Sequence, residues 1–159
     1  MTMTLIETIT VGSGGAASIE FTGIAGDATD LVLLLSLRNS VDSPSATLAF
    51  NTGGSYTRKR LLGNGSAASS DSATVDLQSN TSVSTASTFS NSSVYVSNYA
   101  SAVAKSYSVD SVNENNATLA NQAIIAGSWT GTAAITSLEL TPTSGNFVEH
   151  STASLYSIS

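Results

Sequence analysis

Short apolar or alternating segments, separated by Gly, Asn, Ser or Asp at intervals of roughly eight to twelve residues, make up most of this chain. Segments of that length, rich in Thr and Val, favour strands over helices. We therefore predict an all-β protein of about ten strands, folded as an antiparallel β-sandwich of the jelly-roll type. The clearest patterns in the second half occupy residues 92–99, 104–112, 122–129, 134–140 and 153–158. A helical turn is expected only within 113–124.

Two parts of the chain carry the turn chemistry of β-hairpins. Residues 5–24 contain two strand-like segments around the sequence GSGG, and residues 47–62 contain two around NTGGS. Glycine supplies the positive φ angles that tight hairpin turns require. We expect each pair of segments to form a hairpin within one sheet.

The most hydrophobic segment is residues 30–38, which reads DLVLLLSLR. Leucines at every second position from 31 to 37 fill one face of a strand, and Val32 and Leu34 make most of the other face apolar. A strand that is apolar on both faces is expected in the middle of a sheet, covered on both sides.

The chain of 159 residues is expected to form a single domain spanning residues 1–159. That length is enough to bury a core without disulfides or a structural metal. Between residues 66 and 91, Ser, Ala, Thr and Asn dominate and strand patterns are weak. We expect this part to be a long excursion over the surface of the sandwich.

Composition limits the partners and the compartment. The chain has no cysteine, so disulfides and thiolate metal sites are absent. It shows no signal peptide and no apolar run of the roughly 20 residues that cross a bilayer, which predicts a soluble, unprocessed protein. The net charge of −6 disfavours nucleic acid and anionic membranes as partners, because both would repel an acidic chain.

The residues needed for catalysis are scarce. His150 is the only histidine, no G-x-S-x-G sequence positions a nucleophilic serine, and we expect His150 to lie in a surface turn. Residues 110–116 offer oxygen ligands but lack the spacing of a calcium loop, which favours a polar turn. Paired carboxylates without aromatic platforms are weak evidence for a glycosidase. We predict no enzymatic activity, no metal and no cofactor.

Three of the five basic residues stand side by side at positions 58–60. In a strand, Tyr56, Arg58 and Arg60 share one face, whereas Lys59 lies on the other. One interpretation is structural: the arginines pair with carboxylates on neighbouring strands, or the lysine protects a sheet edge. The other is a docking stripe, in which Arg58 and Arg60 bind carboxylates of a partner protein beside Tyr56.

Trp129 is the only tryptophan and ends the strand-like segment 122–129. A tryptophan in that position is expected in the core. The alternative is a sugar-binding platform, in which Trp129 acts together with Tyr95, Tyr99 or Tyr107.

Most of the chain resembles small all-β virion structural proteins of tailed bacteriophages. The resemblance rests on residues 4–24 and 30–38, on YTRKRLLGNGSAASS at 56–70, and on the C-terminal half from 107 to 129 and from 134 to 158. Within 66–91 it extends to composition only. Such proteins are described as head decoration (cement) proteins or as modules of tail fibres and appendages.

The resemblance implies a function without catalysis. A cement protein would assemble in the bacterial cytoplasm, join the virion as a homotrimer and stabilise the lattice of the major capsid protein. Tyr56, Arg58, Lys59 and Arg60 would then contact an acidic patch of the capsid. The alternative is a tail-fibre or appendage module that binds host-surface carbohydrate through Trp129.

Overall fold

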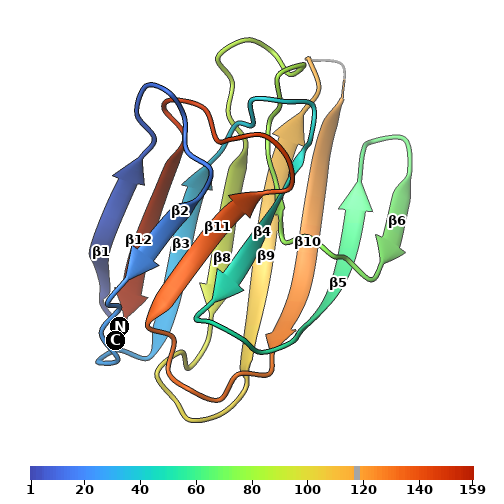
Figure 1. Cartoon of the computed structure of the whole chain (residues 1–159). Helices are drawn as coiled ribbons and strands as arrows, with labels where there is room; N and C mark the ends of the chain where they lie inside the picture. Colours follow the sequence, from blue (N-terminus) through green and yellow to red (C-terminus); the bar gives the residue numbers. More distant parts are fainter. Residues whose placement is uncertain (117–118) are drawn as a thin grey trace.

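All of the regular structure in the described residues consists of β-strands. A computed structural model describes residues 1–116 and 119–159, and within them 53% of the chain is strand and no helix occurs. Two antiparallel sheets pack face to face (Figure 1). The prediction of an all-β antiparallel sandwich is therefore confirmed, with twelve strands where about ten were expected.

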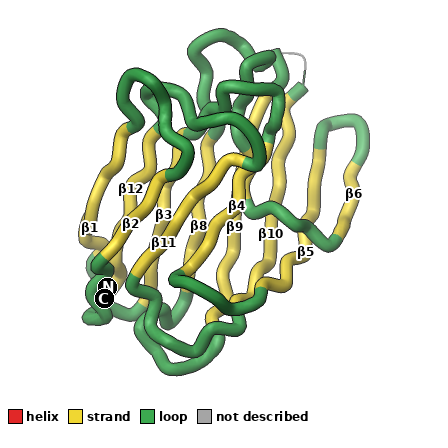
Figure 2. Tube along the Cα trace, viewed as in Figure 1, coloured by secondary structure: helices red, strands yellow, loops and turns green. Residues whose placement is uncertain are grey.

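The two sheets differ in size: one has eight strands and the other has four (Figure 2). In spatial order, the eight-stranded sheet contains β1 (Met3–Thr10), β12 (Thr152–Ile158), β3 (Asp30–Ser36), β8 (Asn91–Val96), β9 (Lys105–Glu114), β10 (Ala120–Trp129), β5 (Tyr56–Gly63) and β6 (Ala68–Asp71). The four-stranded sheet contains β2 (Ile19–Thr22), β11 (Ser137–Pro142), β4 (Ser45–Phe50) and β7 (Leu77–Gln78).

Neither predicted hairpin forms. β1 pairs with β12 while β2 pairs with β11 in the other sheet, and β4 and β5 are likewise in different sheets. The glycine-rich turns carry the chain from one sheet to the other, which lets both strands of each pair direct apolar side chains into the same core. Phe50 of β4 and Tyr56 of β5, for example, approach to 6.1 Å between ring centroids.

The helical turn expected within 113–124 is also wrong in the described residues. β9 continues to Glu114 and β10 begins at Ala120, and their antiparallel register is unbroken from there to the pair of Trp129 with Lys105. Residues 117 and 118 lie outside the described residues.

A single hydrophobic cluster fills the space between the sheets. The eight-stranded sheet contributes alternate residues of β3, β8, β9, β10 and β12, and the four-stranded sheet contributes its own inward side chains. The largest apolar side chains with almost no exposure are Ile19, Phe21, Leu31, Leu33, Leu37, Leu48, Phe50, Leu77, Ile125 and Phe147.

Part of the segment 66–91 is interior, which corrects the expected surface excursion. After the exposed strand β6, the chain crosses to the four-stranded sheet, and every residue from Asp76 to Thr81 is buried. The polar residues tolerate burial because they are hydrogen-bonded: the Gln78 N–H donates to Ser111 Oγ at 2.8 Å, and Asn113 Nδ2 donates to the Ser79 carbonyl at 3.2 Å.

Strand β3 is covered on one side only, contrary to prediction. Its face formed by Leu31, Leu33 and Leu35 lies in the core, whereas Leu34 on the opposite face is 42% exposed. The four-stranded sheet covers one face of the larger sheet, and no described segment forms a layer over the other.

Candidate interaction surface

A densely hydrogen-bonded charged group lies in the interior. The Asp76 carboxylate, which is completely buried, accepts hydrogen bonds from Arg58 Nε at 2.5 Å and Arg58 Nη2 at 2.9 Å. It also accepts from the Tyr107 hydroxyl at 2.7 Å and the Leu48 N–H at 2.8 Å. Four donors saturate the two oxygens, so this cluster joins three strands rather than binding a ligand.

Burial and the Asp76 carboxylate both affect Tyr107. Burial, followed by the charge of Asp76 and its hydrogen bond, raises the pKa of Tyr107 above the ordinary value. The folded protein therefore holds the phenol proton at pH values where the unfolded chain has released it.

We expect the free energy of unfolding to fall as the pH rises above about 10, the ordinary pKa of tyrosine. Because the folded pKa of Tyr107 is the higher one, the stabilisation is complete below the unfolded pKa and is lost above it. Urea unfolding at about pH 8 and about pH 11 measures the loss. Tyr107→Phe should show a smaller loss over the same interval; an equal loss would contradict the assignment to Tyr107.

Lys105 is buried at the end of β9 without a carboxylate partner among the described residues. Its ammonium donates to the carbonyl oxygens of Ser101 at 2.7 Å, Ala133 at 3.0 Å and Val103. Burial lowers its pKa below the usual range. The three carbonyls take up all three N–H bonds, so Lys105 fastens the loop after β8 to the segment that follows β10.

Replacing Lys105 by Met should lower the free energy of unfolding by about 1–3 kcal/mol, because three carbonyl groups lose their donor. The matched control is Lys59→Met, since Lys59 is exposed and should change stability by less than about 0.5 kcal/mol. Chemical denaturation compares the two variants, and equal effects would show that the carbonyl contacts of Lys105 do not stabilise the fold.

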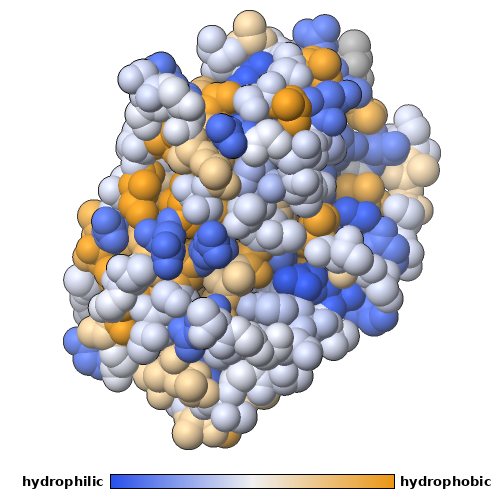
Figure 3. All heavy atoms as spheres, viewed as in Figure 1, coloured by the Kyte–Doolittle hydropathy of each residue, from blue (hydrophilic) through white to orange (hydrophobic). Residues whose placement is uncertain are grey.

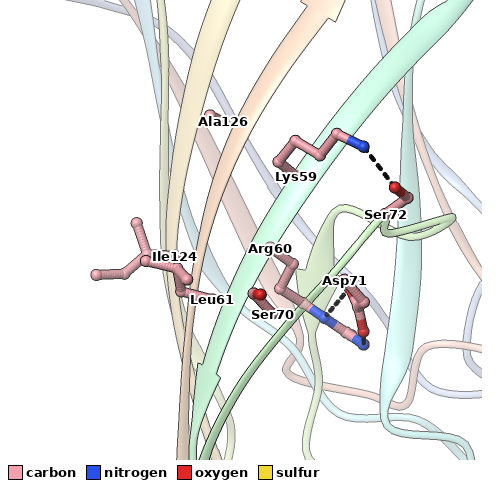
Figure 4. A pocket seen from close by; sticks show the side chains of 8 residues that line it. All are labelled: Lys59, Arg60, Leu61, Ser70, Asp71, Ser72, Ile124 and Ala126. Carbon is pink, nitrogen blue, oxygen red and sulfur yellow. Dashed lines mark hydrogen bonds and ion pairs between the residues drawn. The ribbon is translucent and has the colours of Figure 1, made fainter.

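The basic triplet is divided between the two faces of β5, and Figure 4 shows two of its members, Lys59 and Arg60. Arg58 points inward to Asp76, Arg60 pairs with Asp71 at 2.6 Å, and the Lys59 ammonium donates to Ser72 Oγ at 2.5 Å. The interpretation that the arginines pair with neighbouring carboxylates is confirmed.

A docking role for the four predicted residues stays a prediction, and fewer of their side chains are accessible than the sequence suggested. Arg58 is turned inward with a side chain only 12% exposed, and the half-buried Tyr56 accepts a hydrogen bond from the Phe50 N–H at 2.6 Å. Lys59 and Arg60 reach the surface and remain available to a partner.

Trp129 is a core residue. Its side chain is 2% exposed, its indole N–H donates to the Gly53 carbonyl at 3.1 Å, and its ring packs edge-on against Phe50. Tyr99 and Tyr107 are buried as well, and among the four proposed stacking residues only Tyr95 is exposed. A sugar platform needs an accessible ring face, so the alternative interpretation of Trp129 is wrong.

His150 lies in an exposed turn, as predicted. Its φ of 72° is left-handed, and its N–H donates to the Val11 carbonyl at 2.9 Å. Across residues 1–116 and 119–159, no three His, Asp or Glu side chains lie close enough together to hold a metal ion. The same residues include no helix of the length and hydrophobicity that crossing a membrane requires.

The outer face of the eight-stranded sheet is the side that points away from the four-stranded sheet, and exposed apolar side chains gather on it. Leu61 is 61% exposed and Ile124 is 50% exposed, and these two residues are direct cross-strand neighbours. The other exposed large apolar side chains on this face include Met3, Leu5, Leu34, Tyr95 and Val112.

The opposite side of the molecule differs in character. On the four-stranded sheet, Glu20 and Glu139 are exposed and stand directly opposite one another on neighbouring strands. Figure 3, which views the molecule from this side, shows pale and blue residues over much of the surface, with apolar patches between them. An apolar surface on one sheet and a carboxylate pair on the other suggest different roles for the two faces.

Several shallow hollows mark the outer face. One, of about 530 Å³, lies where β10, β5 and β6 meet and is lined by Lys59, Leu61, Ile124 and Ala126 among others (Figure 4). Another, of about 360 Å³, adjoins it across Ile124 and includes Tyr95. Broad, half-open hollows of this kind suit the side chains of a protein partner better than an enclosed small molecule.

Sequence reasoning missed this surface. The signal was present as apolar residues at solvent-facing positions of several strands, such as Leu34, Tyr95 and Ile124. These residues form one patch only because β3, β8, β9 and β10 are neighbours, and periodicity does not reveal that order.

Comparison of the chain with protein-family models, with curated proteins and with solved structures finds no match. Function is therefore inferred from the residues and their arrangement.

Proposed function

We propose that this protein is a virion structural protein, most specifically a capsid decoration (cement) protein that binds and stabilises the lattice of a major capsid protein. The observation that carries the proposal is the outer face of the eight-stranded sheet. Exposed large apolar side chains stand on five neighbouring strands of this face, which exceeds the scattered single residues normal for a monomer, and exposed apolar patches mark sites of protein association. The virion setting comes from the resemblance of the sequence to tailed-phage proteins.

Two further features support a structural role. The buried Arg58–Asp76 pair and the Lys105 ammonium join strands and loops through satisfied hydrogen bonds, which makes the sheets rigid supports for a contact surface. The alternative function, a carbohydrate-binding appendage, loses its main support because Trp129 is buried.

The proposal is tested on purified virions and on particles assembled without this protein. Mass spectrometry should find a copy number comparable to that of the capsid subunits, and added protein should co-sediment with undecorated heads and raise their resistance to heat. A copy number far below that of the capsid protein, or failure to bind heads, would contradict a lattice-wide role.

A further inference from the structure

The outer face is large enough to form a complete protein–protein interface. Eight strands of four to ten residues, spaced about 4.8 Å apart and rising about 3.3 Å per residue, cover on the order of 900–1,000 Å². A standard interface takes about 800 Å² from each partner. A partner that covers this face must follow the twist of the sheet and present apolar side chains to the exposed ones.

We infer that the partner is a second copy of this chain, packed face to face about a twofold axis that runs parallel to the strands between β8 and β9. This inference goes beyond the proposed function, because a second copy occupies the outer face and a decorating dimer would meet the capsid through its remaining surfaces. The axis lies at the centre of the eight-stranded sheet and turns it over, so that β8 faces β9, β3 faces β10 and β12 faces β5 of the second copy. Each row of residues across the sheet then faces the same row in reverse order.

In the twofold arrangement, the row of residues through Leu34 in one copy packs well against the same row of the other copy, which runs in the reverse order. Hydrogen-bond register aligns Ser154, Leu34, Ser93, Asp110, Ile124 and Leu61 across six neighbouring strands. In the twofold arrangement Leu34 of one copy meets Ile124 of the other. Leu61, the most exposed of these apolar side chains, meets the small Ser154. Apolar groups are thus buried against apolar or small partners.

The neighbouring row behaves in the same way. Register aligns Tyr156, Val32, Tyr95, Ser108, Ala126 and Lys59. Reversal brings Val32 against Ala126 and Tyr95 against Ser108. In these two central pairs a bulky side chain faces a small one, which lets the two sheet faces interdigitate, and at the ends of the row Lys59 meets Tyr156.

The charges on the face follow the same symmetry. Lys59 lies on β5 in one half of the sheet and Asp30 lies on β3 in the other half. The twofold rotation places Lys59 of each copy over β12 of the other copy, beside the strand that carries Asp30. The dimer therefore contains two such contacts. Asp110 is the opposing feature, because it lies on β9 next to the axis and the two copies bring their Asp110 carboxylates toward each other.

The oligomeric state of the purified full chain tests the inference. Light scattering with size exclusion should give twice the chain mass, with the dimer strengthened by salt because each copy carries a net charge of −6. Ile124→Lys should weaken dimerisation at least about tenfold by burying an unpaired ammonium. The control is Val103→Lys, a similarly exposed apolar residue outside the strands, which should dimerise like the parent protein. Asp110→Asn should tighten the dimer.

Cross-linking tests the position of the axis, and the absence of cysteine makes the experiment clean. A mixture of Leu34→Cys and Ile124→Cys chains should be joined by a short bismaleimide, while Leu34→Cys alone should not cross-link to itself. Self-linkage of Leu34→Cys, a monomer at all concentrations, or the trimer expected from the resemblance would each overturn the twofold arrangement.

The same variants separate this inference from the proposed function. A monomeric protein that still binds heads through the outer face, and loses them in Ile124→Lys, would overturn the dimer and leave the decoration role intact. A twofold dimer that binds no heads would support the dimer and contradict the decoration role.

Discussion

Asp76→Asn is expected to lower the free energy of unfolding by about 3–5 kcal/mol, because it leaves the buried Arg58 guanidinium without a counter-charge. The amide also has one acceptor oxygen where four donors converge, and its own N–H groups would point at them. Urea unfolding followed by intrinsic fluorescence measures the loss, since Trp129 is buried in the same core.

The matched control is Asp71→Asn in the other ion pair of β5. Asp71 is 47% exposed and its pairing with Arg60 lies at the surface, so its loss should cost no more than about 1 kcal/mol. A double variant, Arg58→Met with Asp76→Leu, should recover much of the stability because neither residue then leaves an unpaired buried charge. Equal costs for Asp76→Asn and Asp71→Asn would contradict the central role given to Asp76.

The strands could be predicted from the sequence, but their assignment to sheets could not. Alternation is a local property, so segments such as 122–129 are recognisable by themselves. The turn at residues 51–55 has the same glycine chemistry whether the chain makes a hairpin or crosses to the other sheet. What decides between these paths is the shared core, where Phe50 and Tyr56 meet from opposite sheets.

The buried polar segment was hidden for a related reason. Residues such as Asp76 and Gln78 suit a surface loop in composition, and they are stable inside only because specific partners satisfy them. Those partners, Tyr107 and Ser111, lie more than thirty positions away in the sequence. A local sequence pattern therefore cannot predict these hydrogen-bond partners.

The basic triplet shows which features of a site a periodic sequence pattern can predict and which it cannot. Alternation correctly placed Arg58 and Arg60 on one face of β5 and Lys59 on the other. Whether each cation was paired depended on Asp76 and Asp71, which come from strand order and loop path. The exposed outer face depended on strand order as well, so the main contact surface could not be predicted from residues alone.

Gly127→Ala is expected to lower the free energy of unfolding by about 3–5 kcal/mol. Gly127 stands opposite Tyr107 in the sheet, and a Cβ atom added there would lie 2.1 Å from Cζ of the tyrosine ring. The ring is restrained, because its hydroxyl is bonded to Asp76 and it forms a T-shaped contact with Phe50 at a centroid distance of 5.4 Å. Overpacking costs about 1–3 kcal/mol, and losing a hydrogen bond to a charged group costs about 1.5–3 kcal/mol more.

Gly63→Ala on the neighbouring strand β5 separates steric contact from backbone effects. No atom lies within 4 Å of a Cβ placed at Gly63, so alanine there should raise stability by up to about 1 kcal/mol through its smaller entropy loss on folding. Denaturation midpoints of the two variants should therefore shift in opposite directions. In a double-mutant cycle, Tyr107→Leu should remove most of the cost of Gly127→Ala, since the six-membered ring is what the new methyl group meets. Equal and additive effects would mean that the fit of Tyr107 against Gly127 does not hold the core together.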